Sequence, residues 1–97
     1  VDKIANIYFE GKVISRNIFF KNGLRRTLGV MLEGEYEFKT ESIEIIEINS
    51  GNLNLKIEGE DEWKLITEGM EFSVPKNSAF KLKVLDLVNY SCTYIDN

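Results

Sequence analysis

Residues 79–85 read AFKLKVL, in which apolar and basic side chains alternate from Phe80 to Val84. Successive side chains of an extended chain point to opposite faces. One face of this stretch therefore carries Phe80, Leu82 and Val84, and the other carries two lysines. Such alternation predicts a half-buried β-strand. Residues 52–57 (NLNLKI) repeat the pattern, with Leu, Leu and Ile at alternate positions.

The same period-two alternation recurs from one end of the chain to the other, whereas a helical period is hard to find. The breaks between the alternating runs carry glycines that suit tight turns, namely Gly23, Gly34, Gly51, Gly59 and Gly69. Further strands are expected at residues 7–9, 12–20, 26–32, 36–40, 43–48, 63–67, 71–74 and 88–95. About ten short strands joined by short turns predict an all-β sandwich, jelly roll or small barrel.

The composition predicts one globular domain spanning residues 1–97, because a chain of 97 residues leaves no room for a second hydrophobic core. Hydrophobic residues make up 43% of the chain and charged residues 29%, an ordinary balance for such a domain. The net charge is −4, and the basic residues are scattered among acids. We therefore do not expect nucleic-acid binding, which needs clustered cations against the phosphates.

A cytoplasmic location is the expectation from three features of the sequence. The chain has no apolar run of the roughly 18 residues that a membrane span needs, and its first residues lack the apolar core of a signal peptide. Its single cysteine, Cys92, has no partner within the chain for a disulfide, which agrees with a reducing compartment. We therefore expect no membrane association.

Four phrases occur in order along the chain: NIYFEGKV at residues 6–13, GVMLEGEYEF at 29–38, INSGNLNL at 48–55 and GMEFSVP at 69–75. Together with the chain length, they resemble the small pyrimidine/purine nucleoside phosphorylases. The similarity extends from about residue 6 to residue 94. The resemblance implies a single cupin-type jelly-roll barrel. We also expect a homodimer, because so small a barrel has long strand edges to cover.

The comparison with cupins also bears on metal binding. When the cupin motifs are aligned on their glycines, Phe38, Thr40 and Phe80 stand where histidine ligands are usual, and Glu44 lies near the usual glutamate. Three of the four usual ligands are therefore missing, and one carboxylate does not replace several imidazoles. We expect neither a metal nor another cofactor.

The family resemblance implies an enzyme, a glycosyltransferase of the pentosyltransferase type that uses inorganic phosphate as co-substrate. Phosphate would displace the base of purine and pyrimidine nucleosides and leave a free base and a pentose 1-phosphate. Phosphate itself is the nucleophile, so a chain without histidine can support this reaction if positioning and electrostatics supply the rate. The site needs a cation for phosphate, groups that hold the sugar hydroxyls, and an apolar surface for the base.

The adjacent arginines Arg25 and Arg26 are the candidates for binding phosphate, because a guanidinium makes bidentate bonds to phosphate oxygens. The family pattern places an arginine at position 25. Neighbouring strand residues point to opposite faces, so only one of the two arginines can face a given cavity. The alternative is that both are solvated charges after a turn.

Glu44 is the candidate acid of the site. In the run IEIIEI it shares a face with Ile46 and Ile48 and is the only charge on that apolar row. A carboxyl group so placed can bind ribose hydroxyls or protonate the base, and burial would raise its pKa. The alternative is that Glu44 lies at the end of its strand in water.

Three alternating residues, Tyr36, Phe38 and Thr40, are the candidates for holding the substrate, and Phe80 joins them if the cupin topology holds. A base could stack on their shared face. Aromatic residues at strand spacing are also ordinary core residues.

Two functional hypotheses follow from the sequence. One is a broad-specificity nucleoside phosphorylase with its site in the interior of the barrel. The other is a non-catalytic cupin that binds a small molecule or has a structural role, because fold alone does not fix function. A solvent-reachable cavity lined by Glu44, Tyr36 and Thr40, with an arginine at its mouth, would support the enzyme, and a sealed apolar interior would contradict it.

Overall fold

The computed structural model describes residues 2–95, and this part of the chain consists of strands and turns. The elements in chain order are β1 (Asn6–Tyr8), η1 (Phe9–Gly11), β2 (Val13–Phe19), β3 (Arg25–Met31), β4 (Gly34–Lys39), β5 (Ile43–Ser50), β6 (Leu53–Ile57), β7 (Lys64–Ile66), β8 (Glu71–Val74), β9 (Ala79–Val84) and β10 (Val88–Ile95). The prediction of an all-β chain with about ten strands is confirmed. Across residues 2–95, no helix has the length and apolar character needed to cross a membrane.

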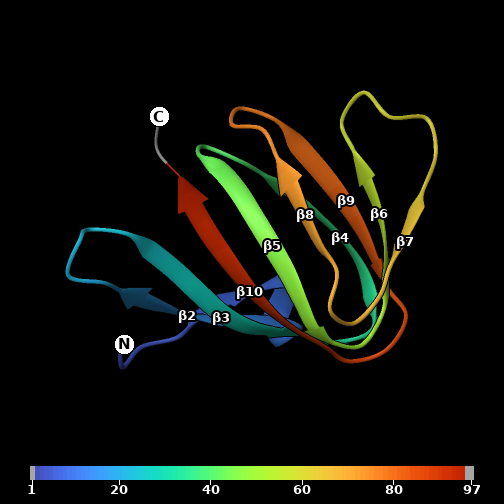
Figure 1. Ribbon diagram of the computed structural model, residues 1–97. Helices are drawn as coiled ribbons and strands as arrows, with labels where there is room; N and C mark the ends of the chain where they lie inside the picture. Colours follow the sequence, from blue (N-terminus) through green and yellow to red (C-terminus); the bar gives the residue numbers. More distant parts are fainter. Residues whose placement is uncertain (1, 96–97) are drawn as a thin grey trace.

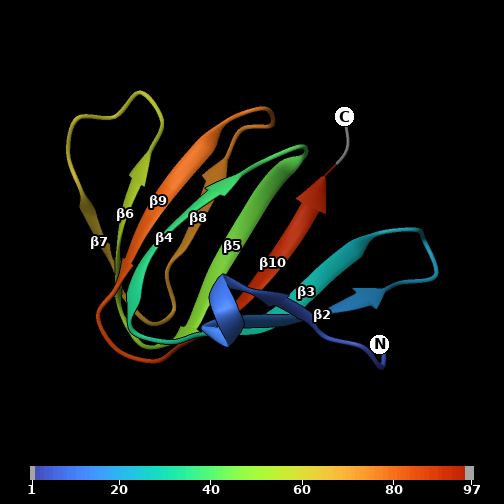
Figure 2. The same ribbon diagram turned by 180° about the vertical axis from the view of Figure 1, so that it is seen from behind.

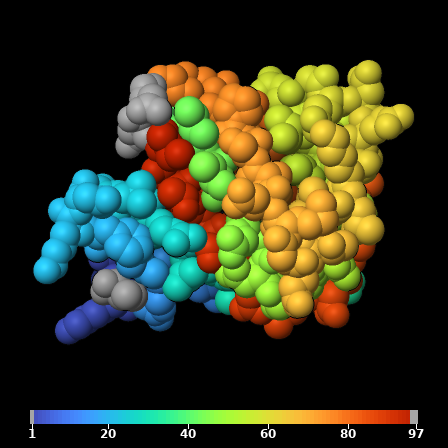
Figure 3. Space-filling view, in the orientation of Figure 1, coloured from blue at the N-terminus to red at the C-terminus, as the bar shows by residue number. Residues whose placement is uncertain are grey.

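The strands form two antiparallel sheets that face each other (Figure 1). The large sheet has the order β1-β2-β3-β10-β5-β8, and the small sheet has the order β4-β9-β6-β7. Figure 2 shows β4 and β9 of the small sheet in front of β8, while the β2–β3 hairpin extends sideways beyond the small sheet. We call β1, β2 and β3 the arm, and in Figure 3 the tip of the arm projects from the body of the molecule.

The expected closed barrel is not observed among residues 2–95, where the two sheets remain separately hydrogen-bonded. The order of the chain explains the difference. From β3 onward, consecutive strands lie in opposite sheets at every step except from β6 to β7. Neighbours in sequence therefore pack face to face instead of pairing through backbone hydrogen bonds, which gives two packed layers.

The hydrophobic core lies between the sheets, and the alternating stretch that predicted the fold is at its centre. Strand β9 lies between β4 and β6, and Phe80, Leu82 and Val84 are all buried. Leu82 is paired with Tyr36 on one side and with Leu55 on the other. The prediction from residues 79–85 is therefore confirmed, because the apolar face of the strand packs against the opposite sheet.

The largest local departure from the expected strands is at Phe9, which was predicted to continue β1. Phe9 and Glu10 instead have φ of 51° and 57° and belong to the short 3-10 turn η1. The Phe9 ring lies 4.9 Å from that of Tyr36 and 5.4 Å from that of Phe38 between centroids. This aromatic packing accounts for the turn, because it favours folding the chain back over β4.

Candidate active site

A cavity of about 360 Å³ lies between the two sheets, where the arm joins the body of the molecule. Both sheets contribute to it, and so do the exposed residues Lys39 and Glu41 near its mouth. The lining residues are Tyr8, Ser15, Arg25, Met31, Phe38, Lys39, Glu41, Ser42, Glu44, Ile46, Phe80, Leu82, Tyr90, Cys92 and Tyr94. The interior is therefore not a sealed apolar core at this end.

Arg25 and Glu44 lie in one row across three neighbouring strands. Tyr94 of β10 is paired with Arg25 of β3 on one side and with Glu44 of β5 on the other. The Arg25 guanidinium stacks on the Tyr94 ring, 3.8 Å from its centroid, and its Nη1 donates a hydrogen bond of 3.3 Å to Asn17 Oδ1. The cation is thus held in place at the cavity wall from two sides.

Glu44 is a half-buried carboxyl at the start of β5, on the same face as the buried Ile46 and Ile48. Burial raises the pKa of Glu44, while a hydrogen bond from Cys92 and the positive charge of Arg25 oppose that rise. The Cys92 thiol donates to Glu44 Oε1 over 3.5 Å. The carboxyl therefore has a fixed donor on one oxygen.

Phe38 of β4 and Phe80 of β9 form an aromatic wall on the small-sheet side of the cavity. They are paired in register, and their rings are stacked with centroids 5.5 Å apart at 24°. The Tyr8 ring contacts Phe38 edge-on, with 6.4 Å between centroids. A flat heterocycle has a matching surface here, because aromatic rings favour offset stacking and edge contacts.

Tyr36 and Thr40 do not line this cavity, although they share a face with Phe38 as expected. The Tyr36 hydroxyl donates a 2.7 Å hydrogen bond to the Leu32 carbonyl, and the Thr40 hydroxyl donates one of 2.6 Å to the carbonyl of Pro75. Both side chains are buried. Their hydroxyls hold the backbone near the two ends of β4. A role of Tyr36 and Thr40 in substrate binding remains a prediction.

Arg26 is not among the residues that line the cavity, as expected for the neighbour of Arg25 on a strand. Its Nε is buried and has no hydrogen-bond partner within residues 2–95. The structure thus brings together four of the predicted site residues, Arg25, Glu44, Phe38 and Phe80, and separates them from Arg26, Tyr36 and Thr40.

The sequence did not single out the β10 residues Tyr90, Cys92 and Tyr94 as site residues, although all three line the cavity. Burial and the Glu44 charge raise the pKa of Cys92 to about 12, and burial raises that of Tyr90 to about 12. These groups therefore stay protonated near neutral pH. Alternate residues of a strand share one face, but only the pairing of β10 with β3 and β5 shows that this face lies beside Arg25 and Glu44.

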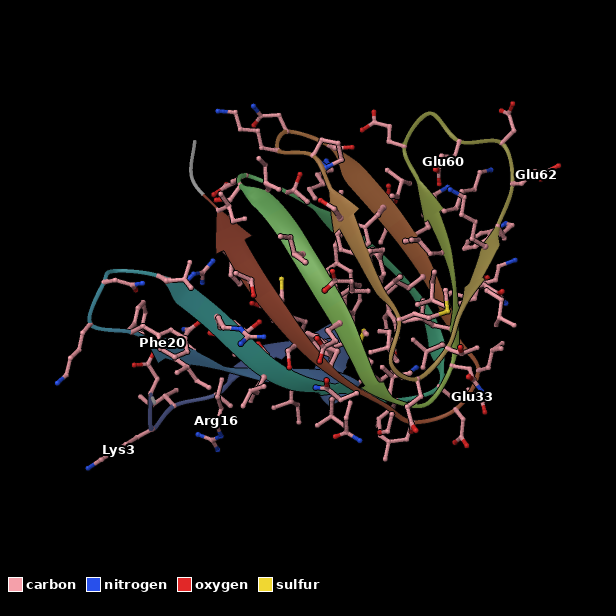
Figure 4. All side chains as sticks on the ribbon, in the orientation of Figure 1. Lys3, Arg16, Phe20, Glu33, Glu60 and Glu62 are labelled. Atoms are coloured by element: carbon pink, nitrogen blue, oxygen red, sulfur yellow. The ribbon has the colours of Figure 1, made fainter. Side chains whose placement is uncertain are left out.

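Charge is unevenly distributed around the site. Residues 1–31 contain six basic and two acidic residues, a net charge of +4, whereas the rest of the chain contains six basic and fourteen acidic residues, a net charge of −8. Figure 4 shows Arg16 on the arm, Lys3 in the segment that leads into it, and Glu60 and Glu62 at the opposite side of the molecule. Arg25 belongs to the basic part, which favours the approach of an anion from the side of the arm.

Within residues 2–95, no group of three or more His, Cys, Asp or Glu side chains is arranged to hold a metal ion. The expectation of a site that works without metal or cofactor remains a prediction.

The two-sheet fold and this cavity define a class: small all-β proteins with a pocket between the sheets that combines one arginine, one half-buried carboxyl and an aromatic wall. The family model for pyrimidine/purine nucleoside phosphorylase matches residues 3–94. The chain belongs to this family, and the resemblance noted in its sequence is confirmed.

Individual relatives agree with this assignment. A protein named pyrimidine/purine nucleoside phosphorylase from Geotalea uraniireducens is 51% identical over 92 residues, which are 95% of this chain and 88% of the relative. One of the same name from Chlorobium chlorochromatii is 47% identical over 98% of this chain and 91% of its own. The crystal structure of a protein of unknown function from Acinetobacter sp. ADP1 superposes with a TM-score of 0.93 at 36% identity, covering 97% of this chain and 91% of that chain.

Proposed function

We propose that the protein is a nucleoside phosphorylase that accepts both purine and pyrimidine nucleosides. A phosphate oxygen forms a bond to C1′ of the pentose, the glycosidic bond to the base breaks, and its electron pair leaves with the base, which takes up a proton. The products are the free base and a pentose 1-phosphate. The observation that carries the proposal is the row of Arg25, Tyr94 and Glu44 opposite the Phe38–Phe80 wall.

Arg25 binds the phosphate in this proposal. The Tyr94 ring covers one face of the guanidinium, and the hydrogen bond to Asn17 uses a donor on Nη1. An arginine fork has five N–H donors, so the remaining donors suffice for bidentate contact with phosphate. The basic arm brings the anion to this point.

Glu44 acts as a carboxylate that accepts hydrogen bonds from the ribose hydroxyls and balances the positive charge that develops on the sugar. Its Oε1 accepts a hydrogen bond from the Cys92 thiol. In this proposal, Oε2 accepts a hydrogen bond from a hydroxyl of the sugar. Negative charge next to a sugar with oxocarbenium character stabilises the transition state more than the ground state. The competing role is a protonated Glu44 that donates to the base, and the two roles have opposite pH dependences.

The aromatic wall of Phe38 and Phe80, edged by Tyr8, stacks on the base. A cavity of about 360 Å³ lies at the lower end of the range for small-molecule sites. Stacking depends little on which heterocycle is bound, since every base has an aromatic face. This accounts for an enzyme that accepts both classes of base.

The finer features of the proposal are a single cupin-type domain, catalysis without a metal or cofactor, a cytoplasmic location and a homodimer. The homodimer is supported by the outer face of the arm, which carries Ile7, Ile14 and Leu28 at 65%, 38% and 48% exposure. An apolar patch on the outside of a sheet is typical of an interface. Light scattering tests it: we expect a dimer, and a monomer at micromolar concentration contradicts the proposal.

The test of the activity is to incubate the purified protein with uridine, inosine, adenosine and guanosine, with and without inorganic phosphate, and to separate released bases by chromatography. We expect release of several bases only when phosphate is present. Release without phosphate would indicate hydrolysis or a contaminant, and no release would favour the non-catalytic cupin.

Two variants locate the site. Arg25→Ala is expected to lower kcat/KM about 100-fold, because the guanidinium supports both binding and the transition state, and Glu44→Gln is expected to lower it about tenfold or more. Lys81→Ala is the matched control, since Lys81 is an exposed cation on the outer face of β9 and does not line the cavity. Equal losses in Arg25→Ala and Lys81→Ala would contradict the assignment.

A further inference from the structure

We infer that Tyr94 and Cys92, alternate residues of β10, are positioning residues: Tyr94 sets the orientation of Arg25, and Cys92 sets the orientation of the Glu44 carboxyl. The kinetic tests of this inference rest on the proposed function. The contacts behind it lie where β10 pairs with β3 and β5, at the centre of the large sheet. Neither residue touches the reacting atoms in this scheme.

Tyr94 holds Arg25 through the face of its ring. The guanidinium carbon lies 3.8 Å from the ring centroid, which is close contact for a cation over an aromatic face. The ring is itself fixed, because its hydroxyl is hydrogen-bonded to that of the buried Thr27 at 3.3 Å. An arginine on so long a side chain would otherwise sample many rotamers and lose entropy on binding an anion.

Cys92 holds Glu44 through its thiol. The side chain is buried, with 2% exposure, and its sulfur donates to Glu44 Oε1 over 3.5 Å. The raised pKa of Cys92 keeps the proton on sulfur, so this thiol is a donor and not a nucleophile. One carboxyl oxygen of Glu44 is therefore occupied, in a residue that lines the cavity.

Other groups also act on Glu44, and the test must separate them from Cys92. The charged or titratable side chains that share the cavity with Glu44 are Tyr8 of β1, Arg25 of β3, Lys39 at the end of β4, Glu41 after it, and Tyr90 and Tyr94 of β10. Replacing Cys92 leaves all of these residues in the chain, but the thiol is also hydrogen-bonded to Tyr94. A change in the Glu44 titration that occurs in Cys92→Ala and not in Tyr94→Phe, which removes the Tyr94 hydroxyl, therefore reports the contact between the thiol and Glu44.

The first experiment compares Cys92→Ala with Cys92→Ser. The Glu44 carboxyl is titrated by carbon-13 NMR without substrate, and the pH profile of kcat is measured with uridine and phosphate. We expect Cys92→Ala to raise the pKa of Glu44, because a donor to the charged form is lost, and to lower kcat about fivefold. Cys92→Ser keeps a donor and is expected to restore both. An unchanged pKa of Glu44 in Cys92→Ala overturns the role of Cys92.

The second experiment compares Tyr94→Leu with Tyr94→Phe. Phosphate binding to the protein is measured by calorimetry, and KM for phosphate is measured separately from kcat. We expect Tyr94→Leu to weaken phosphate binding about threefold to tenfold, because the stacking surface is lost, whereas Tyr94→Phe keeps that surface, loses only the hydroxyl contact that fixes the ring, and should weaken binding by less than about twofold. Equal weakening in both variants, or in neither, overturns the role of Tyr94.

The two proposals can fail separately. If the parent protein releases no base from any nucleoside, the proposed function fails. The Glu44 titration and the phosphate calorimetry still decide whether Cys92 and Tyr94 position their partners, since neither measurement needs turnover. Thermal unfolding of each variant shows whether a loss comes from unfolding instead.

Discussion

The same two strands, β5 and β10, line two very different regions of the space between the sheets (Figure 1). At one end, which we call the closed end, Ile48 of β5 and Val88 of β10 are fully buried and pack with Leu53 and Val84 of the small sheet. At the other, the open end, β5 presents Glu44 and β10 presents Tyr94. The side chains change from apolar to charged along β5 and from apolar to polar along β10.

The closed end stabilises the fold, and the open end holds the groups proposed to carry out the chemistry. Close packing at the closed end supplies the hydrophobic stabilisation of the fold. The open end leaves a cavity and a desolvated carboxyl, both of which cost stability. A rigid closed end allows the open end to hold Arg25 and Glu44 at fixed positions, because strands position side chains more accurately than loops do. The predictions below test this separation.

The largest expected effect is on stability, from Leu53→Ala at the closed end. Leu53 has 0% exposure, and truncating a buried leucine costs about 3 kcal/mol through lost burial and the cavity left behind. Urea unfolding measures the loss. Leu65→Ala on β7 is the control, since Leu65 is 55% exposed and should lose under about 0.5 kcal/mol.

The activity of the folded Leu53→Ala variant is the sharper part of this test. At a temperature where the variant is folded, we expect its kcat/KM to stay within about twofold of the parent, because no residue of the open end is changed. A folded variant with little activity would mean that the two ends are not separable.

The next effect is the pH dependence of activity at the open end. A Glu44 that works as a carboxylate must be ionised, so kcat/KM should fall about tenfold per pH unit as the pH falls below the pKa of Glu44. Because burial raises that pKa, the fall begins at a higher pH than for an ordinary glutamate. The acid limb should vanish in Glu44→Gln. A rate that rises as the pH falls would instead assign Glu44 the role of a proton donor.

The closed end is easier to predict from sequence than the open end. The alternation in residues 79–85 identifies a buried face without any tertiary information, because burial of one face follows from the period of the strand. The same rule correctly separates the faces of Arg25 and Arg26 and places Glu44 on the row of Ile46 and Ile48. These are local properties of an extended chain.

The open end depends on contacts between distant strands, which the periodicity of one strand does not reveal. Cys92 and Glu44 are 48 residues apart, and only the register of β10 against β5 makes them neighbours. Tyr36 shares a face with Phe38 but lies two residues away along β4, where it is paired with Leu82. Its hydroxyl donates to the Leu32 carbonyl and does not line the cavity. The missing barrel closure has the same cause, since alternation does not determine which strands pair.

A smaller effect concerns the stability cost of the open end. The folded state raises the pKa of Glu44 and so binds its proton more tightly than the unfolded chain does. The free energy of unfolding of the parent therefore decreases as the pH rises from the unfolded pKa through the folded pKa, and remains lower above it. Glu44→Gln removes this ionisation, and we expect a gain of up to about 1 kcal/mol at neutral pH.

The control for this gain is on the same strand. Glu47 is exposed on the opposite face of β5, and Glu47→Gln should change the free energy of unfolding by less than about 0.5 kcal/mol. Equal changes in the two variants, measured by thermal or urea unfolding, would mean that the gain reflects net charge and not the burial of Glu44.

The smallest expected effect is from Glu35→Gln on the outer face of the small sheet, outside the space that the two ends divide. The Glu35 carboxyl lies 3.9 Å from Lys83 Nζ, and the two side chains are 75% and 41% exposed. Pairs so exposed contribute at most about 0.5 kcal/mol, and Lys83 keeps its contact with the Trp63 ring, 4.2 Å from the centroid. We expect urea unfolding and kcat/KM to be unchanged within that limit. A large loss of activity with unchanged stability would show that the outer face of the small sheet takes part in function, and the chemistry could then no longer be assigned to the open end alone.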